Sequence, residues 1–226
     1  MIILLLAVFV VCLYFRFPIA FSLGLSFLVY FIFKGTPLVV VPLKMYAGID
    51  VFILLSIPGF IMAGNLMNQG GLTDRIIDFC NHLLGHVRGG LSYVNISASM
   101  LFAGISGTAI SDTASLGAVM IPAMKKEGYD SDFSCAITAA SSTVGPIIPP
   151  SLPMIIAATL SGLSVGKLFL AGAIPGLLLG LGLMMVAYFV AKKKNYPKHS
   201  KSSLLQILKS FTNTFWALLM TVIILF

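Results

Sequence analysis

In a chain of 226 residues, 58% hydrophobic and only 9% charged side chains leave too few polar groups for the surface of a soluble domain. The mean hydropathy of +1.04 indicates a polytopic membrane protein instead. The three cysteines lie far apart with no neighbouring histidine pattern, which argues against a disulfide framework or a transition-metal site.

The net charge of +7 comes from lysines and arginines that lie between the hydrophobic segments, where they set membrane topology and do not indicate nucleic-acid binding. Of the 14 basic residues, 11 can lie on one side of the membrane, whereas Lys34, Lys44 and Lys167 fall on the other. Because basic residues collect on the cytoplasmic side, this distribution predicts a multi-pass membrane protein whose N-terminus lies outside.

Residues 1–71 are predicted to form membrane helices of a scaffold-like domain. Two short apolar runs, 1–15 and 18–33, are followed by an outer connection or interfacial helix at 36–50 and by a further span at 51–67. The first two runs are shorter than the roughly 20 residues that cross a bilayer upright, so we expect short helices packed within protein.

Residues 72–86 are predicted to form an amphipathic helix along the inner membrane interface. Apolar residues recur at helical spacing on one face, whereas Asp74, Arg75, Asp78 and His82 cover most of the other face. A solvated cytoplasmic connector is the alternative interpretation.

Two apolar regions, 87–128 and 129–163, are each interrupted by small, polar and proline residues, at 104–112 and at 141–150. Basic residues flank both ends of the first region, so its chain enters and leaves on the same side, as a re-entrant hairpin. In hydrocarbon, backbone without hydrogen bonds survives only inside protein or around a polar cavity. We therefore expect a site formed by this hairpin and a discontinuous helix, as in many secondary transporters.

The remaining segments are a membrane helix at 164–195, a cytoplasmic linker at 196–210 and the start of another membrane helix at 211–226. We expect this last helix to continue a longer architecture, of which the chain is a fragment or one piece of a split permease. Because it starts from the inside, it would open a second half of opposite topology. The predicted fold is an all-α membrane protein, one half of an inverted repeat.

The side chains at the two breaks suit the binding of sodium and of an anion. Sodium prefers several neutral oxygens, which the hydroxyls and helix-end carbonyls of residues 106–108 and 141–143 supply. The half-helices that start near Thr108 and Ser151 carry partial positive charge, which suits a carboxylate substrate. We predict substrate contacts from Thr108, Ser141, Pro149 and Ser151.

Asp112 is the one acidic residue in the membrane part of the hairpin. A carboxylate buried in a membrane segment is costly and is a functional-site hypothesis by default. Asp112 also lies in the first turn after the hairpin tip, where it would stabilise the helix dipole. Support of an ion site and helix capping are therefore both open roles for this residue.

Several sequence blocks carry a family resemblance: His86-Val87-Arg88-Gly89-Gly90-Leu91, Ala103-Gly104-Ile105-Ser106-Gly107-Thr108, Ile121-Pro122-Ala123-Met124 with Gly128-Tyr129, and residues 142–153. They closely resemble the large membrane subunit of the tripartite ATP-independent periplasmic (TRAP) transporters. The resemblance covers nearly the whole chain, but only the N-terminal half of that subunit. It implies that the membrane is a bacterial inner membrane and that the N-terminus is periplasmic.

The resemblance implies a sodium-driven importer of organic acids, such as C4-dicarboxylates or sialic acids, with no cofactor besides the coupling ion. It implies an elevator motion, in which the hairpin and the broken helix move against a scaffold. The implied partners are a small four-helix membrane subunit, a periplasmic substrate-binding protein, the C-terminal half of the permease and membrane lipid. The substrate would lie between this hairpin and a symmetry-related second one, which the sequence does not show. The implied sodium ligands are Ser106, Gly107, Ser142, Thr143 and Gly145.

Other interpretations compete with this one. A stand-alone sodium- or proton-coupled anion symporter would carry similar hairpins without needing a binding protein. The block Gly104-Ile105-Ser106-Gly107 matches a serine nucleophile pattern of an intramembrane protease, although no histidine follows Ser106 in a membrane span to act as its base. A non-transporting assembly fragment is a further alternative for the isolated chain.

Overall fold

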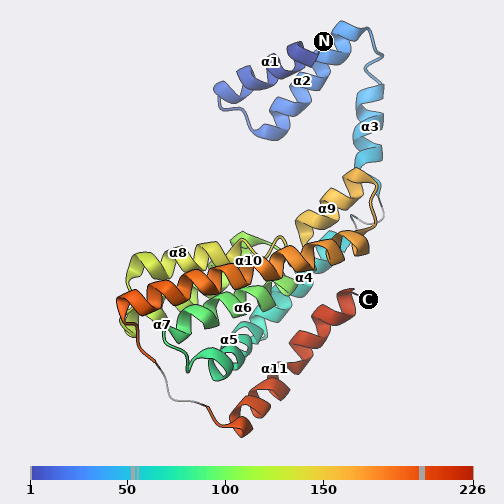
Figure 1. Ribbon diagram of the computed structural model, residues 1–226. Coiled ribbons are helices and arrows are strands. Elements are labelled where there is room, and N and C mark those ends of the chain that lie inside the picture. The colour runs from blue at the N-terminus through green and yellow to red at the C-terminus, as the bar shows by residue number, and fades with distance from the viewer. Residues whose placement is uncertain (1, 52–53, 55, 199–201, 226) are drawn as a thin grey trace. The chain divides into compact units, whose positions relative to one another are not determined.

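The structure is a computed structural model, and it describes residues 2–51, 54, 56–198 and 202–225 (Figure 1). Within its helices, the side chains of residues 60, 67, 68, 103–106, 216–218 and 220–225 lie outside the description. Every regular element in the described part of the chain is a helix, which confirms the all-α prediction. The chain divides into two compact units, Met1–Phe52 and Ile53–Phe226.

The first unit contains three helices: α1 (Ile2–Tyr14), α2 (Ile19–Lys34) and α3 (Val40–Ile49). Helices α1 and α2 pack against each other. The buried side chains of α2 are Ser22 and Ser26, and the Ser26 hydroxyl donates to the carbonyl O of Ser22 at 2.6 Å. Small polar residues that bond back to their own helix allow close helix contact, whereas most large apolar side chains of this unit are exposed.

The second unit begins with α4 (Ser56–Gln69) and α5 (Leu72–Leu84). Helix α5 is amphipathic, and its buried face, with Thr73, Ile76 and Cys80, packs against the following helix. Helix α4 also packs against α5 and that helix, so it belongs to the same compact unit. The position of α5 along a membrane interface stays a prediction.

The centre of this unit is formed by three mutually packed helices, α6 (Gly90–Ser106), α7 (Ala109–Lys126) and α8 (Ser131–Ser142) (Figure 1). The largest fully buried apolar side chains here come from α6, from α7 and from the segment that follows α8: Val94, Ile96, Phe102, Leu116, Met120, Met124 and Val144. The connection between α6 and α7 consists of Gly107 and Thr108 alone. It is therefore shorter than the break expected at 104–112, because α6 continues through Gly104 to Ser106.

Helices α9 (Leu152–Ser161) and α10 (Val165–Lys194) follow, and α9 packs against α10. Among the described residues, α10 is the one helix long and apolar enough to cross a membrane by itself. The shorter apolar helices are α1, α2, α3 and α9.

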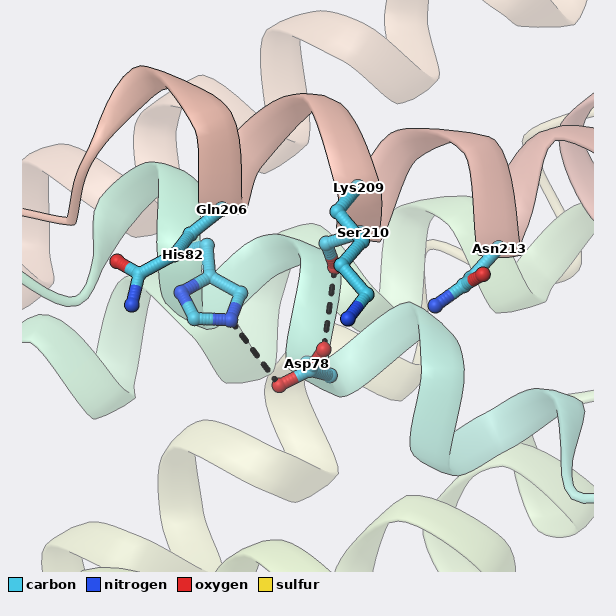
Figure 2. Close-up of a pocket in the computed structure, with 6 residues that line it drawn as sticks. All are labelled: Asp78, His82, Gln206, Lys209, Ser210 and Asn213. Atoms are coloured by element: carbon cyan, nitrogen blue, oxygen red, sulfur yellow. Dashed lines mark hydrogen bonds and ion pairs between the residues drawn. The ribbon is translucent and has the colours of Figure 1, made fainter.

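The last helix, α11 (Leu204–Leu225), starts seven residues before the predicted position 211 and occupies part of the expected linker. Its start is capped, because the backbone N–H of Ser203 donates to Gln206 Oε1 at 3.0 Å. Figure 2 shows how its polar side chains meet α5: Ser210 Oγ donates to Asp78 Oδ2 at 3.1 Å, and His82 Nε2 lies 3.5 Å from Asp78 Oδ1.

Candidate ion and substrate site

The tip of the hairpin between α6 and α7 touches the interruption between α8 and α9. Gly107 at this tip has a φ of +60°, a left-handed conformation that glycine adopts without strain. A Cβ placed on Gly107 would lie 3.1 Å from the backbone N of Leu152 and 3.4 Å from the carbonyl O of Pro150. Both the conformation and the close approach therefore favour glycine at the tip.

A second glycine makes the reciprocal contact from the interrupted segment. A Cβ placed on the buried Gly145 would lie 3.1 Å from the carbonyl O of Ser142 and 3.8 Å from that of Thr108. The two breaks, which are far apart in the sequence, are thus in contact with each other. We call the place where they meet, residues 106–108 and 141–152, the junction.

Two helices begin at the junction, and each has a hydroxyl cap. Thr108 is the N-cap of α7, and its side chain accepts a hydrogen bond from the N–H of Ser111 at 3.3 Å. Ser151 is the N-cap of α9; it accepts from the N–H of Met154 at 3.4 Å and donates to the carbonyl O of Pro146 at 2.6 Å. The partially positive ends of α7 and α9 therefore both lie at the junction.

The end of α8 brings three consecutive hydroxyls to the junction. Ser142 Oγ donates to the carbonyl O of Thr138 at 2.9 Å, and Thr143 Oγ1 donates to that of Ala140 at 2.7 Å. Ser141 and Ser142 are buried, whereas Thr143 is exposed. A hydroxyl oxygen that donates its proton keeps its lone pairs, so this set can present neutral oxygens to a cation.

Asp112, in the first turn of α7, is fully buried. Neither of its carboxylate oxygens has a hydrogen bond of good geometry within the described residues, although the hydroxyls of Ser142 and Ser99 lie beside it. A buried negative charge without a counter-charge is strongly unfavourable. A cation bound at this position would therefore be stabilised by the carboxylate of Asp112 as well as by the neutral oxygens.

A row of polar side chains continues from Asp112 into the packing between α6 and α8. Ser99 Oγ lies 3.0 Å from Ser141 Oγ, and one turn further Asn95 Nδ2 donates to Thr138 Oγ1 at 2.6 Å. All four side chains are fully buried. The sequence interpretation missed Asn95 and Ser99; the signal was polar residues at i and i+4 on an otherwise apolar hairpin arm.

Three glycines spaced by four residues on α10 support the interrupted segment from behind. A Cβ on Gly172 would lie 2.7 Å from the carbonyl O of Ile147, and one on Gly176 would meet the side chain of Ile148. Gly180 lies on the same face of α10, and a Cβ on it would meet the side chain of Met100 in α6. Small residues at this spacing let helices approach closely, and this pattern was also missed in the sequence.

The structure thus brings together Gly107, Thr108, Ser142, Gly145 and Ser151 of the predicted site, with Asp112 beside Ser142. Ser141 faces Ser99, Pro149 is buried within the interrupted segment, and Thr143 is exposed at its edge. The side chain of Ser106 lies outside the described residues. The binding roles of all these residues stay predictions.

An all-helical chain whose two interrupted segments meet at their breaks is typical of the secondary-transporter class of membrane proteins. Residues 6–226 match the family model described as "Tripartite ATP-independent periplasmic transporter, DctM component". The chain belongs to this family, whose members are inner-membrane transporter permeases and not enzymes. The protease hypothesis for Ser106 is therefore wrong.

Three relatives illustrate the match. The chain is 42% identical over 221 residues to the sialic acid TRAP transporter permease protein SiaT of Haemophilus influenzae, covering 97% of this chain and 36% of that protein. It is 44% identical over 211 residues to the sialic acid TRAP transporter large permease protein SiaM of Vibrio cholerae, covering 92% and 49%. It is 42% identical over 205 residues to the C4-dicarboxylate TRAP transporter large permease protein DctM of Pseudomonas aeruginosa, covering 90% and 48%. The chain thus spans between a third and a half of the length of these relatives.

Proposed function

We propose that this chain is part of the large permease subunit of a sodium-coupled importer of organic acids. The observation that carries the proposal is the contact of Gly107 and Thr108 with Gly145 and Leu152, because it brings hydroxyls, helix ends and backbone together at the junction. Membership of the transporter family supports a role of this chain in transport. The names of the relatives point to sialic acids or C4-dicarboxylates as substrates.

The proposed coupling ion is sodium, with Ser106, Gly107, Ser142, Thr143 and Gly145 as the residues that form its site. Neutral oxygens at the end of α8 suit a monovalent cation, which loses less on dehydration than a divalent one. Asp112 has the further role of balancing the charge of the ion from the first turn of α7, since its buried carboxylate has no counter-charge among the described residues.

The proposed substrate contacts are Thr108, Ser141, Pro149 and Ser151. The capped starts of α7 and α9 lie at the junction, and helix N-termini stabilise carboxylates through their free N–H groups and their dipoles. An organic acid would therefore bind next to the sodium ion, with its negative charge close to the positive charge of the ion.

The proposed transport cycle is of the elevator type, with the hairpin of α6 and α7 and the interrupted pair α8 and α9 in the moving part and residues 1–71 in the scaffold. A small membrane subunit and a periplasmic substrate-binding protein are the proposed partners, as the name of the tripartite family implies.

The test is uptake of labelled sialic acid or succinate into proteoliposomes that contain the complete permease and its small subunit. We expect uptake only with an inward sodium gradient and the binding protein present. Sodium-dependent uptake without the binding protein would support a stand-alone symporter instead, and uptake without a sodium gradient would overturn the proposed coupling.

A further inference from the structure

A cavity of about 190 Å³ lies where the cytoplasmic entry of the hairpin approaches the end of α10, and Arg88, Tyr188 and Lys192 line it. Tyr188 and Lys192 are one turn apart on α10, whereas Arg88 comes from the connection between α5 and α6. Two cationic side chains and a phenol from separate parts of the chain therefore converge on one small space.

Among the residues that the structure describes, neither cation of this cavity has an acidic partner. Within the described residues, the ion pairs shorter than 4 Å are His82 with Asp78 and Lys194 with Asp130. Arg88 donates from Nη1 to Asn195 Oδ1 at 3.2 Å, and this neutral amide holds the guanidinium beside the end of α10. The cavity thus combines two positive charges for which the described part of the chain provides no counter-charge, and this favours an anionic ligand.

An exposed apolar face of α10 leads directly to the cavity. Leu181, Met185 and Tyr188 precede Lys192 at spacings of four, three and four residues, so they share one side of the helix. Their exposed fractions are 51% for Leu181, 64% for Met185 and 48% for Tyr188. An apolar stripe that ends in a tyrosine and two cations matches the order of groups in a phospholipid, from acyl chain to phosphate.

We propose that this cavity binds the phosphate of an anionic phospholipid, with the acyl chains along Leu181 and Met185. Arg88 offers a planar set of donors to the phosphate, Lys192 a second positive charge and Tyr188 a hydroxyl donor. The partially negative end of α10 opposes an anion, and the consecutive lysines Lys192, Lys193 and Lys194 offset it. The proposal depends on α10 crossing the membrane and is independent of the sodium site.

The experiment measures lipid binding to the complete permease, purified in detergent and depleted of lipid, by native mass spectrometry. Phosphatidylglycerol and cardiolipin are titrated against phosphatidylcholine and inorganic phosphate. Each basic residue near an anionic lipid contributes about a fivefold factor in affinity, so Arg88→Gln with Lys192→Gln should weaken anionic lipid binding by about 25-fold. Tyr188→Phe, which keeps the ring, should weaken it by a few-fold.

The matched control is Lys125→Gln with Lys126→Gln, which removes two exposed lysines from the last turn of α7 that are not among the residues lining the cavity. We expect this control to bind anionic lipid within about twofold of the unmodified protein. An equal loss in the control would overturn the proposal in favour of unspecific charge attraction. Equal binding of phosphatidylcholine, or equal competition by inorganic phosphate alone, would also overturn it.

Discussion

Gly107 and Leu152 bring the two discontinuous segments into contact, with 3.1 Å between the position of a Cβ on Gly107 and the backbone N of Leu152. This distance is shorter than an ordinary van der Waals contact. Any side chain at the tip would therefore push the hairpin away from the start of α9. The sodium and substrate sites proposed above both depend on this contact.

Gly107→Ala should raise the sodium concentration for half-maximal uptake by about tenfold, since it separates the two breaks. Its positive φ alone costs an alanine about 1 to 2 kcal/mol of stability. The matched control is Gly128→Ala, because Gly128 has a φ of +87° with no atom within 4 Å of its Cβ position. Measured by uptake and thermal unfolding, both variants should lose stability, whereas only Gly107→Ala should change the sodium dependence. An equal change in both would refute a role for the contact.

Thr143→Ala should raise the half-saturating sodium concentration by about three- to tenfold, as expected for the loss of one neutral ligand. Thr113→Ala is the control, because its exposed hydroxyl donates to the carbonyl O of Ala109 at 2.8 Å, much as Thr143 does to Ala140. Uptake assays over a range of sodium concentrations compare the two. If Thr143→Ala behaves like Thr113→Ala, Thr143 is not a ligand.

Gly176→Ala should destabilise the protein by about 1 to 3 kcal/mol and slow uptake, because the new methyl group would overlap with Ile148 and displace the interrupted segment. Gly182→Ala, on the same helix, has no atom within 4 Å of its Cβ position and should be neutral or slightly stabilising. Thermal unfolding and initial uptake rates test this pair. Equal effects of both substitutions would show that α10 does not support the segment as described.

Asp130 joins the start of α8 to the end of α10, with Lys194 Nζ 2.9 Å and Tyr196 Oη 2.8 Å from its Oδ2. Hydrogen bonds from Lys194 and then Tyr196 lower the pKa of Asp130 below its ordinary value of 3.8. The carboxylate therefore stabilises the fold above about pH 4, and this contribution is lost as the pH falls toward the lowered pKa.

In Asp130→Asn, the unfolding temperature should therefore fall less steeply than in the unmodified protein as the pH is lowered from about 5 to about 3. Asp132→Asn removes the same charge from the first turn of α8 and should leave that decrease unchanged. Unfolding temperatures recorded across this pH range compare the two variants. A decrease as steep in Asp130→Asn as in the unmodified protein would contradict the assigned contact.

The sequence predicted the elements that local patterns determine. Helix α5, Leu72–Leu84, lies within the segment 72–86 that helical periodicity predicts, and Gly71 and Gly85 flank it. Helix α11 begins at Leu204 and not at the predicted position 211, because the capping pair Ser203 and Gln206 lies within a polar stretch that resembles a linker. The hairpin break is narrower than the predicted 104–112, because α6 continues through Gly104 to Ser106 and α7 begins at Ala109.

The candidate site could be predicted only as separate pieces. Glycines, hydroxyls and prolines marked each break, but the contact of Gly107 with Leu152 joins positions far apart in the sequence and follows from no local pattern. The polar row of Asn95 and Ser99 against Thr138 and Ser141 likewise depends on the packing of α6 against α8. Such pairings are set by tertiary packing, which a single sequence does not show.

The most direct test of the account is the effect of sodium on thermal unfolding in Asp112→Asn and in the unmodified permease, with choline chloride as the reference salt. A ligand that binds only the folded state stabilises it by mass action, so sodium should raise the unfolding temperature of the unmodified protein. Asp112→Asn removes an unpaired buried charge, so it should be at least as stable in choline and should lose most of the sodium effect. An unchanged sodium effect together with lower stability in choline would contradict the account and assign Asp112 a capping role.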